Sequence, residues 1–189
     1  MEAFLSSAAA VAIAEIGDKT QLLALFLITR YKRPWTITLG VFLSTLVNHG
    51  LSAWLGAWVA QMIPPGWIPW LVSLSFFAVG LWLLVPDKDD SDDSRFTQYG
   101  PLLATLVLFF LAEIGDKTQI ATVILAAKYH DTLAVVAGTT VGMLLANVPI
   151  IFAGGWLMDK MPLQLARRAA FVLFMALAFI TLVGRVFWQ

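Results

Sequence analysis

One eight-residue motif with three charged side chains occurs twice in this sequence without a change. It reads Ala-Glu-Ile-Gly-Asp-Lys-Thr-Gln and covers residues 14–21 and 112–119, an offset of 98 residues. Each copy lies in the middle of a long apolar segment, where burial of charge is costly. Charged residues at such depth mark functional positions by default, so the two motifs predict a functional site.

The four carboxylates of the motifs are the candidate metal ligands. Glu15 and Asp18 are three residues apart, so they share a face of a continuous helix, and the same spacing relates Glu113 to Asp116. If the two copies meet, all four carboxylates converge. Carboxylate oxygens suit Ca²⁺, Mg²⁺ or Mn²⁺. The lack of cysteine argues against Cu(I), and Zn²⁺ normally takes more histidine or cysteine.

Other polar side chains of the same segments are candidates for additional ligands or for donors to the ligands. They are Gln21, Gln119, Asn48, Asn147, Thr20 and Thr118. Gly17 and Gly115 permit a kink inside the motifs, which would free backbone carbonyls. Pro149 is expected to disturb the segment around Asn147 and to free a carbonyl there. For Asn147, a ligand role and a plain helix–helix hydrogen bond stay equally open.

Lys19 and Lys117 are the expected charge partners of the carboxylates. They would hold the carboxylates in place or occupy the site when the metal leaves. Each motif carries two negative charges and one positive charge, so the ionised pair of motifs totals −2. One divalent cation or two protons would neutralise that charge, which favours an exchange of one for the other. The structural alternative is that lysine–carboxylate pairs merely fasten helices, but fastening does not need four acids for two bases.

His49 makes the two halves of the candidate site unequal. It aligns with Asn147 at the 98-residue offset, near the centre of its own apolar segment. A proton-relay role is one interpretation, and an ordinary intramembrane histidine is the one we favour. The difference argues against a strictly symmetric set of ligands.

The elements that must position these residues are those of an integral membrane protein. Of the 189 residues, 60% are hydrophobic and 13% are charged, against about a quarter charged in a soluble domain. The net charge is zero and there is no basic patch, so nucleic acid is not an expected partner, whereas the lipid bilayer is. Residues 1–13 lack a positive amino-terminal region, so a cleaved signal peptide is not expected.

Six helices are expected, because a backbone in lipid must satisfy its own hydrogen bonds and a span needs about 20 apolar residues. Their predicted ranges are 4–28, 35–61, 67–85, 101–127, 132–158 and 165–187. The first three form a repeat over residues 1–86 and the last three a repeat over 100–189, with an acidic cytoplasmic linker at 87–99. Three spans is an odd number, so the second repeat must enter the membrane from the opposite side. The predicted fold class is all-α integral membrane, with six transmembrane helices as two inverted three-helix repeats.

Lysine and arginine are divided unevenly between alternate loops. On the side of the membrane that holds the loop around Arg33, the loops contain eight of these residues. The loops and ends on the other side contain two, Lys128 and Arg185. The richer side is expected in the cytoplasm, which places both termini outside.

The hexamer Glu-x-Gly-Asp-Lys-Thr, present in both motifs, resembles the signature of the Golgi and bacterial calcium/manganese:proton exchanger family. The resemblance covers nearly the whole chain, and the short length is similar to the bacterial branch of manganese exporters, which implies a multi-pass protein of the bacterial inner membrane. It implies export of Mn²⁺, or of Ca²⁺, in exchange for protons by alternating access, with no enzymatic activity. In that family role, Glu15, Asp18, Glu113 and Asp116 are the ligands. The physiological metal, the proton stoichiometry and the choice between monomer and homodimer stay open.

Three other functions remain open as alternatives. A cation channel would lack proton coupling, and an exporter of cationic amino acids would be competed by lysine or arginine. An intramembrane lipid-phosphate hydrolase ranks lower, because phosphate chemistry favours arginine and serine, and the spans offer only Lys19 and Lys117 as cations.

Overall fold

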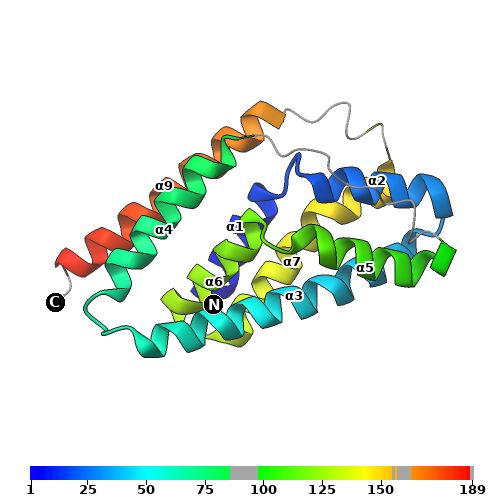
Figure 1. Cartoon of the computed structure of the whole chain (residues 1–189). Coiled ribbons are helices and arrows are strands. Elements are labelled where there is room, and N and C mark those ends of the chain that lie inside the picture. The colour runs from blue at the N-terminus through cyan, green and yellow to red at the C-terminus, as the bar shows by residue number, and fades with distance from the viewer. Residues whose placement is uncertain (86–97, 155, 157–162, 188–189) are drawn as a thin grey trace.

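Helices account for the regular secondary structure in the part of the chain that the computed structural model describes, residues 1–85, 98–154, 156 and 163–187 (Figure 1). The helices are α1 (Glu2–Ala14), α2 (Lys19–Tyr31), α3 (Pro34–Met62), α4 (Ile68–Leu83), α5 (Pro101–Glu113), α6 (Lys117–Tyr129), α7 (Thr132–Ala153) and α9 (Leu163–Phe187). The linker predicted at 87–99 falls mostly outside the described residues.

Two of the expected continuous helices are broken at the motifs. The segment 4–28 is divided into α1 and α2, and the segment 101–127 into α5 and α6. Gly17 and Gly115 have φ angles of 81° and 76°, a left-handed conformation that glycine adopts without steric cost. The prediction that Glu15 and Asp18 share a helix face is therefore wrong, because the backbone turns away from the helix between them.

The helix ends follow local sequence signals. Proline occupies the first turn of α3, α4 and α5, where its missing N–H is not needed. The Asp131 side chain caps α7 by accepting from the Ala134 N–H at 3.1 Å. Lys32 and His130, which are equivalent in the repeat, end α2 and α6 in the left-handed conformation.

The disturbance expected at Pro149 does not end α7. The helix runs from Thr132 to Ala153 with the proline inside it. A proline removes one backbone N–H, and helices packed among other helices tolerate that loss when neighbouring groups satisfy the freed carbonyls. The N–H that Pro149 lacks would have bonded the Leu145 carbonyl, and the adjacent Ala146 carbonyl accepts a hydrogen bond from the Gln21 side chain of α2.

The sequence repeat is also a repeat in packing. A Cβ atom at Gly40 of α3 would lie 2.7 Å from the Thr105 side chain of α5. The equivalent Gly138 of α7 approaches α1 in the same way, at Ser7, which is the counterpart of Thr105. Glycine at both positions lets the backbones pack closely, as small residues do between membrane helices.

Helices α4 and α9 lie side by side and form a pair on one side of the molecule (Figure 1). Phe76 of α4 and its repeat counterpart Phe174 of α9 meet edge to face, with ring centroids 5.9 Å apart, and both are fully buried. The pair packs against α1 and α6, whereas no comparable packing joins it to α2 or α5 in the described structure. The two halves are thus alike in sequence but unequal in their packing.

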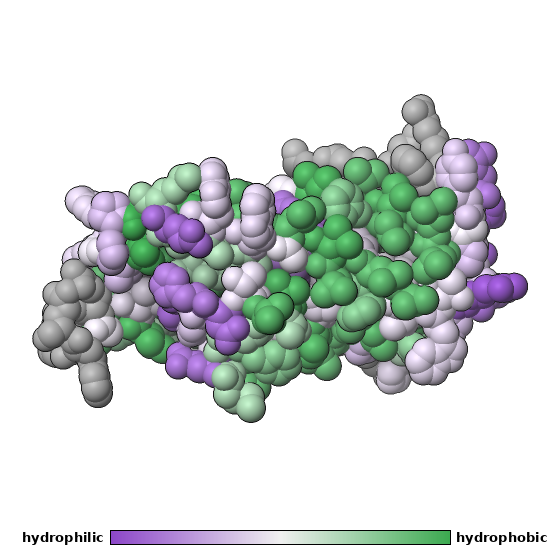
Figure 2. Space-filling model, turned by 90° about the horizontal axis from the view of Figure 1, so that it is seen from below, coloured by the Kyte–Doolittle hydropathy of each residue, from purple (hydrophilic) through white to green (hydrophobic). Residues whose placement is uncertain are grey.

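The surface of the molecule is strongly apolar. Large exposed hydrophobic side chains include those of Trp54, Leu74, Leu145 and Phe179. Figure 2 shows one face on which a broad hydrophobic area lies between groups of hydrophilic residues. Among the described helices, α7 is long and apolar enough to cross a membrane by itself, while α1, α4, α5 and the stretch Arg168–Gly184 of α9 are shorter apolar helices.

Candidate cation-binding site

Three of the four predicted carboxylates come together between the two repeats. One oxygen from each of Glu15, Glu113 and Asp116 lies within 4.8 Å of the other two, and all three residues are buried. Glu15 follows the last residue of α1, Glu113 ends α5, and Asp116 precedes α6. Asp18, the counterpart of Asp116, is buried as well but does not belong to this group.

The helix breaks place the glutamates at helix carboxyl ends. Such ends carry a partial negative charge, so a cation between Glu15 and Glu113 would face two favourable helix dipoles in addition to the carboxylates. An intact helix would have given the same side chains no such ends. The broken helices therefore contribute to the electrostatics of the site as well as to its shape.

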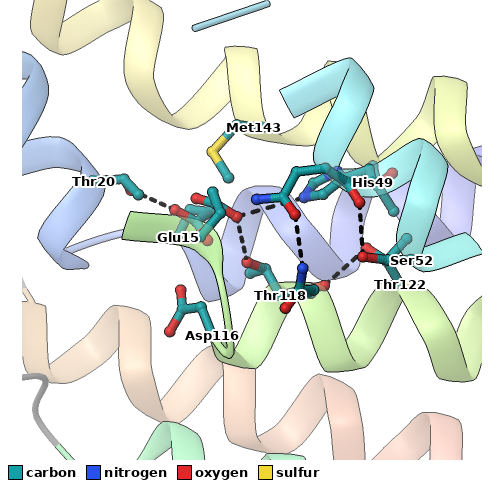
Figure 3. Close-up of polar contacts among 12 residues, drawn as sticks. Glu15, Thr20, His49, Ser52, Asp116, Thr118, Thr122 and Met143 are labelled. Carbon is teal, nitrogen blue, oxygen red and sulfur yellow. Dashed lines mark hydrogen bonds and ion pairs between the residues drawn. The ribbon is translucent and has the colours of Figure 1, made fainter. Parts of the chain in front are cut away.

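Threonine hydroxyls orient both glutamates. Thr20 Oγ1 donates to Glu15 Oε2 at 2.5 Å, and Thr118 Oγ1 donates to Glu113 Oε2 at 3.2 Å (Figure 3). The Oε1 atom of each glutamate has no hydrogen-bond partner among the described residues, and neither has Asp116 Oδ2. Each of the three carboxylates thus has one oxygen that could bind a cation. The two threonines hold Glu15 and Glu113 in place.

The motif glutamines stabilise the breaks. The Gly17 N–H donates to Gln21 Oε1 at 2.7 Å, and the Gly115 N–H donates to Gln119 Oε1 at the same distance. Both amide oxygens are thereby engaged by the backbone of their own motif. The glutamines consequently satisfy N–H groups that leave the helical hydrogen-bonding pattern at the glycine.

The same glutamines also join each motif to the opposite repeat. Gln21 Nε2 donates to the Ala146 carbonyl of α7 at 2.9 Å. Gln119 Nε2 donates to Asn48 Oδ1 of α3 at 2.7 Å. Ala146 and Asn48 are counterparts at the 98-residue offset, so one contact is made twice, once to a backbone carbonyl and once to a side chain.

The two lysines of the motifs have different partners. Lys19 Nζ lies 3.5 Å from Asp116 Oδ1, which forms an ion pair between the two repeats. Lys117 Nζ donates to the Val85 carbonyl at 3.1 Å and lies 6.0 Å from the centre of the Trp82 ring. Lys19 thus lies beside the carboxylate group, whereas Lys117 contacts Val85 and Trp82.

His49 and Asn147 are both fully buried, and His49 lies next to Glu113. His49 Nε2 is 3.6 Å from Glu113 Oε2. Asn147 Nδ2 donates to the Met143 carbonyl at 3.1 Å and contacts Met143 Sδ at 3.0 Å. Figure 3 shows Met143 and Asp116 on opposite sides of Glu15. Sequence reasoning missed Met143, although its position one helical turn before Asn147 puts both on one face of α7.

A buried carboxylate group at two broken helices, built from two repeats, has the construction of a secondary transporter for cations. The comparisons with known proteins agree with that class. The sequence pattern of the family described as "Divalent cation/proton antiporter GDT1" matches residues 3–91 and 101–188. The chain therefore belongs to this family, which comprises cation/proton antiporters and not enzymes.

Relatives of known name cover almost the whole chain. A protein of Vibrio cholerae named "Putative manganese exporter" is 52% identical over 172 residues, which is 90% of this chain and 86% of the relative. "GDT1-like protein 5" of Arabidopsis thaliana is 27% identical over 212 residues, 92% of each chain. The protein of that name in Oryza sativa subsp. japonica is 28% identical over 212 residues, 91% of this chain and 90% of the relative. No solved structure matches the chain.

Proposed function

We propose that this protein exports Mn²⁺ from the cytoplasm in exchange for protons, with Ca²⁺ as the second candidate cargo. The observation that carries the proposal is the meeting of Glu15, Glu113 and Asp116 from both repeats within 4.8 Å. A hard divalent cation is the species that such a set of oxygens binds. The name of the Vibrio cholerae relative and its 52% identity support Mn²⁺ as the cargo.

The proposed architecture is six transmembrane spans in two inverted three-helix repeats. The spans are α1 with α2, α3, α4, α5 with α6, α7, and α9. The paired helices α1 and α2 have 13 residues each, so together they reach the about 20 residues that a bilayer requires. The two ranges matched by the family pattern support the division into repeats at 1–86 and 100–189 with a linker at 87–99.

The proposed location is the bacterial inner membrane with both termini outside. Arg30 lies in the last turn of α2 and Lys32 and Arg33 lie in the loop to α3, and such basic segments stay in the cytoplasm. In this orientation α2 and α5 lie on the cytoplasmic side of the carboxylates, and α1 and α6 lie on the outer side. Export then carries the cation from the side of α2 and α5 to the side of α1 and α6.

The proposed ligands are the carboxylates of Glu15, Glu113, Asp116 and Asp18. The first three already lie together, and Asp18 is included as the repeat counterpart of Asp116. Two protons replace one divalent cation without changing the total charge of the site. Protons entering from outside therefore neutralise the acids and release the metal, and deprotonation on the cytoplasmic side restores the binding state.

The test is metal-driven proton movement in liposomes that contain the purified protein and an internal pH dye. Glu113→Gln keeps the size of the side chain and removes the charge, so proton movement on addition of Mn²⁺ should disappear. Glu2→Gln is the matched control, because Glu2 is exposed at the start of α1 and should behave as wild type. Metal entry without proton movement would identify a channel instead, and competition by lysine or arginine would identify an amino-acid exporter.

A further inference from the structure

His49 is a fully buried imidazole in the middle of α3. Neither of its ring nitrogens has a hydrogen-bond partner among the described residues. A buried polar group without a partner costs free energy, so such groups are rare and call for an explanation. His49 is not one of the three residues whose oxygens lie within 4.8 Å of one another, but it lies beside Glu113, so an ion bound at Glu113 would supply the missing partner.

The spacing between His49 and Glu113 fits two ligand atoms of one ion. Nε2 lies 3.6 Å from Glu113 Oε2, which is too long for a hydrogen bond. Two ligand atoms that each lie about 2.1 Å from a metal ion are separated by about 3–3.6 Å at the usual angles between ligands. Figure 3 shows His49 reaching from the middle of α3 toward the carboxylates.

The repeat counterpart of His49 offers a different atom. Asn147 Oδ1 is buried and has no hydrogen-bond partner in the described part of the chain. The two counterparts thus differ in chemistry: His49 offers an imidazole nitrogen beside Glu113, whereas Asn147, which contacts Met143, offers an amide oxygen. Oxygen suits every hard divalent cation, whereas nitrogen discriminates among them, because Ca²⁺ and Mg²⁺ bind oxygen almost exclusively and first-row transition metals accept imidazole.

We propose that His49 Nε2 is a ligand of the transported ion and that it selects transition-metal ions such as Mn²⁺ over Ca²⁺ and Mg²⁺. This inference rests on the proposed function and specifies its cargo. Because nitrogen ligands bind Co²⁺ more tightly than Mn²⁺, Co²⁺ should compete with Mn²⁺ at the site. Oxygen ligands alone would give no such preference over Ca²⁺.

The direct test is the electron spin-echo spectrum of the protein loaded with Mn²⁺. A nitrogen bound to Mn²⁺ adds a ¹⁴N modulation, which oxygen ligands do not produce. The chain has two histidines, so the protein must be purified without a polyhistidine tag. The modulation should be present in the wild type and in His130→Asn, and absent in His49→Asn. His130 is exposed at the end of α6 in a left-handed conformation that asparagine tolerates, which makes it the matched control.

The second test is the ratio of Mn²⁺ to Ca²⁺ half-saturation in liposomes. His49→Asn, which installs the residue found at the counterpart position, should shift this ratio against Mn²⁺ by about tenfold or more. Wild-type protein that binds Mn²⁺ without ¹⁴N modulation, or a variant that loses both ions equally, would overturn the role of His49 and leave the exchanger intact. Wild-type protein with no metal-driven proton movement would overturn the exchanger itself.

Discussion

At the scale of residues, identical motifs have taken unequal roles. Asp116 joins the carboxylate group and pairs with Lys19, whereas its counterpart Asp18 lies outside that group. Gln21 binds a backbone carbonyl of the opposite repeat, whereas Gln119 binds the side chain of Asn48. The chemistry of a motif residue is thus set by what the other repeat presents to it.

Gln119→Leu should destabilise the fold. The change leaves the Gly115 N–H and Asn48 Oδ1 without the partners that Gln119 supplies. The Gly115 N–H is exposed, so the cost comes from the buried Asn48 side chain, and a buried polar group that loses its partner costs about 1–3 kcal/mol. Thermal unfolding in detergent should show a lower midpoint, while Gln61→Leu, the same change at the exposed end of α3, should leave the midpoint near wild type. Equal midpoints in the two variants would mean that the glutamine does not stabilise the break.

At the scale of elements, close helix contacts hold the broken helices in place. Gly56 of α3 faces the Val123 carbonyl of α6 so closely that an added Cβ atom would overlap it. Gly50, on the same helix, has nothing within 4 Å of an added Cβ. Contacts of this kind fix where α6, and with it Asp116, lies relative to α3.

Gly56→Ala should therefore weaken the packing of α3 on α6. Overpacking typically costs about 1–3 kcal/mol. Gly50→Ala should instead be neutral or slightly stabilising, because alanine favours a helix over glycine by about 1 kcal/mol. The yield of monodisperse protein and its midpoint of thermal unfolding would distinguish the two variants. Similar behaviour of both would show that the close approach at Gly56 is relaxed in the membrane.

The sequence predicted the helical segments and allowed a kink at Gly17 and Gly115, but it did not predict that each segment is divided into two helices. Hydropathy averaged along 4–28 and 101–127 does not reveal that Gly17 and Gly115 adopt a left-handed conformation. The convergence of Glu15 with Glu113 followed from the repeat, because equivalent residues near a pseudo-twofold axis meet. The separation of Asp18 from that group did not follow, because it depends on the direction of the chain after the break and on contacts between the repeats.

At the scale of the whole molecule, the proposed inverted topology can be tested directly because the chain contains no cysteine. Single cysteines at Arg33 and Leu133 would lie in the loop after α2 and at the start of α7, and both side chains are exposed. A membrane-impermeant maleimide added to intact cells should label Leu133→Cys, and Arg33→Cys only after the cells are opened. Labelling of both from one side would contradict the inverted repeats.

The pair of α4 and α9 rests on α1 and α6 and makes no comparable contact with α2 and α5 in the described structure. In the repeat, α1 corresponds to α5, α2 to α6, and α4 to α9. If the two halves exchanged conformations, the pair of α4 and α9 would instead pack against α2 and α5, on the opposite side of the carboxylates. The free-energy difference between the two arrangements then depends on the residues in which the halves differ. Since about 1.4 kcal/mol changes a population ratio tenfold, single substitutions in α4 or α9 should set the fraction of time that the site faces each side of the membrane.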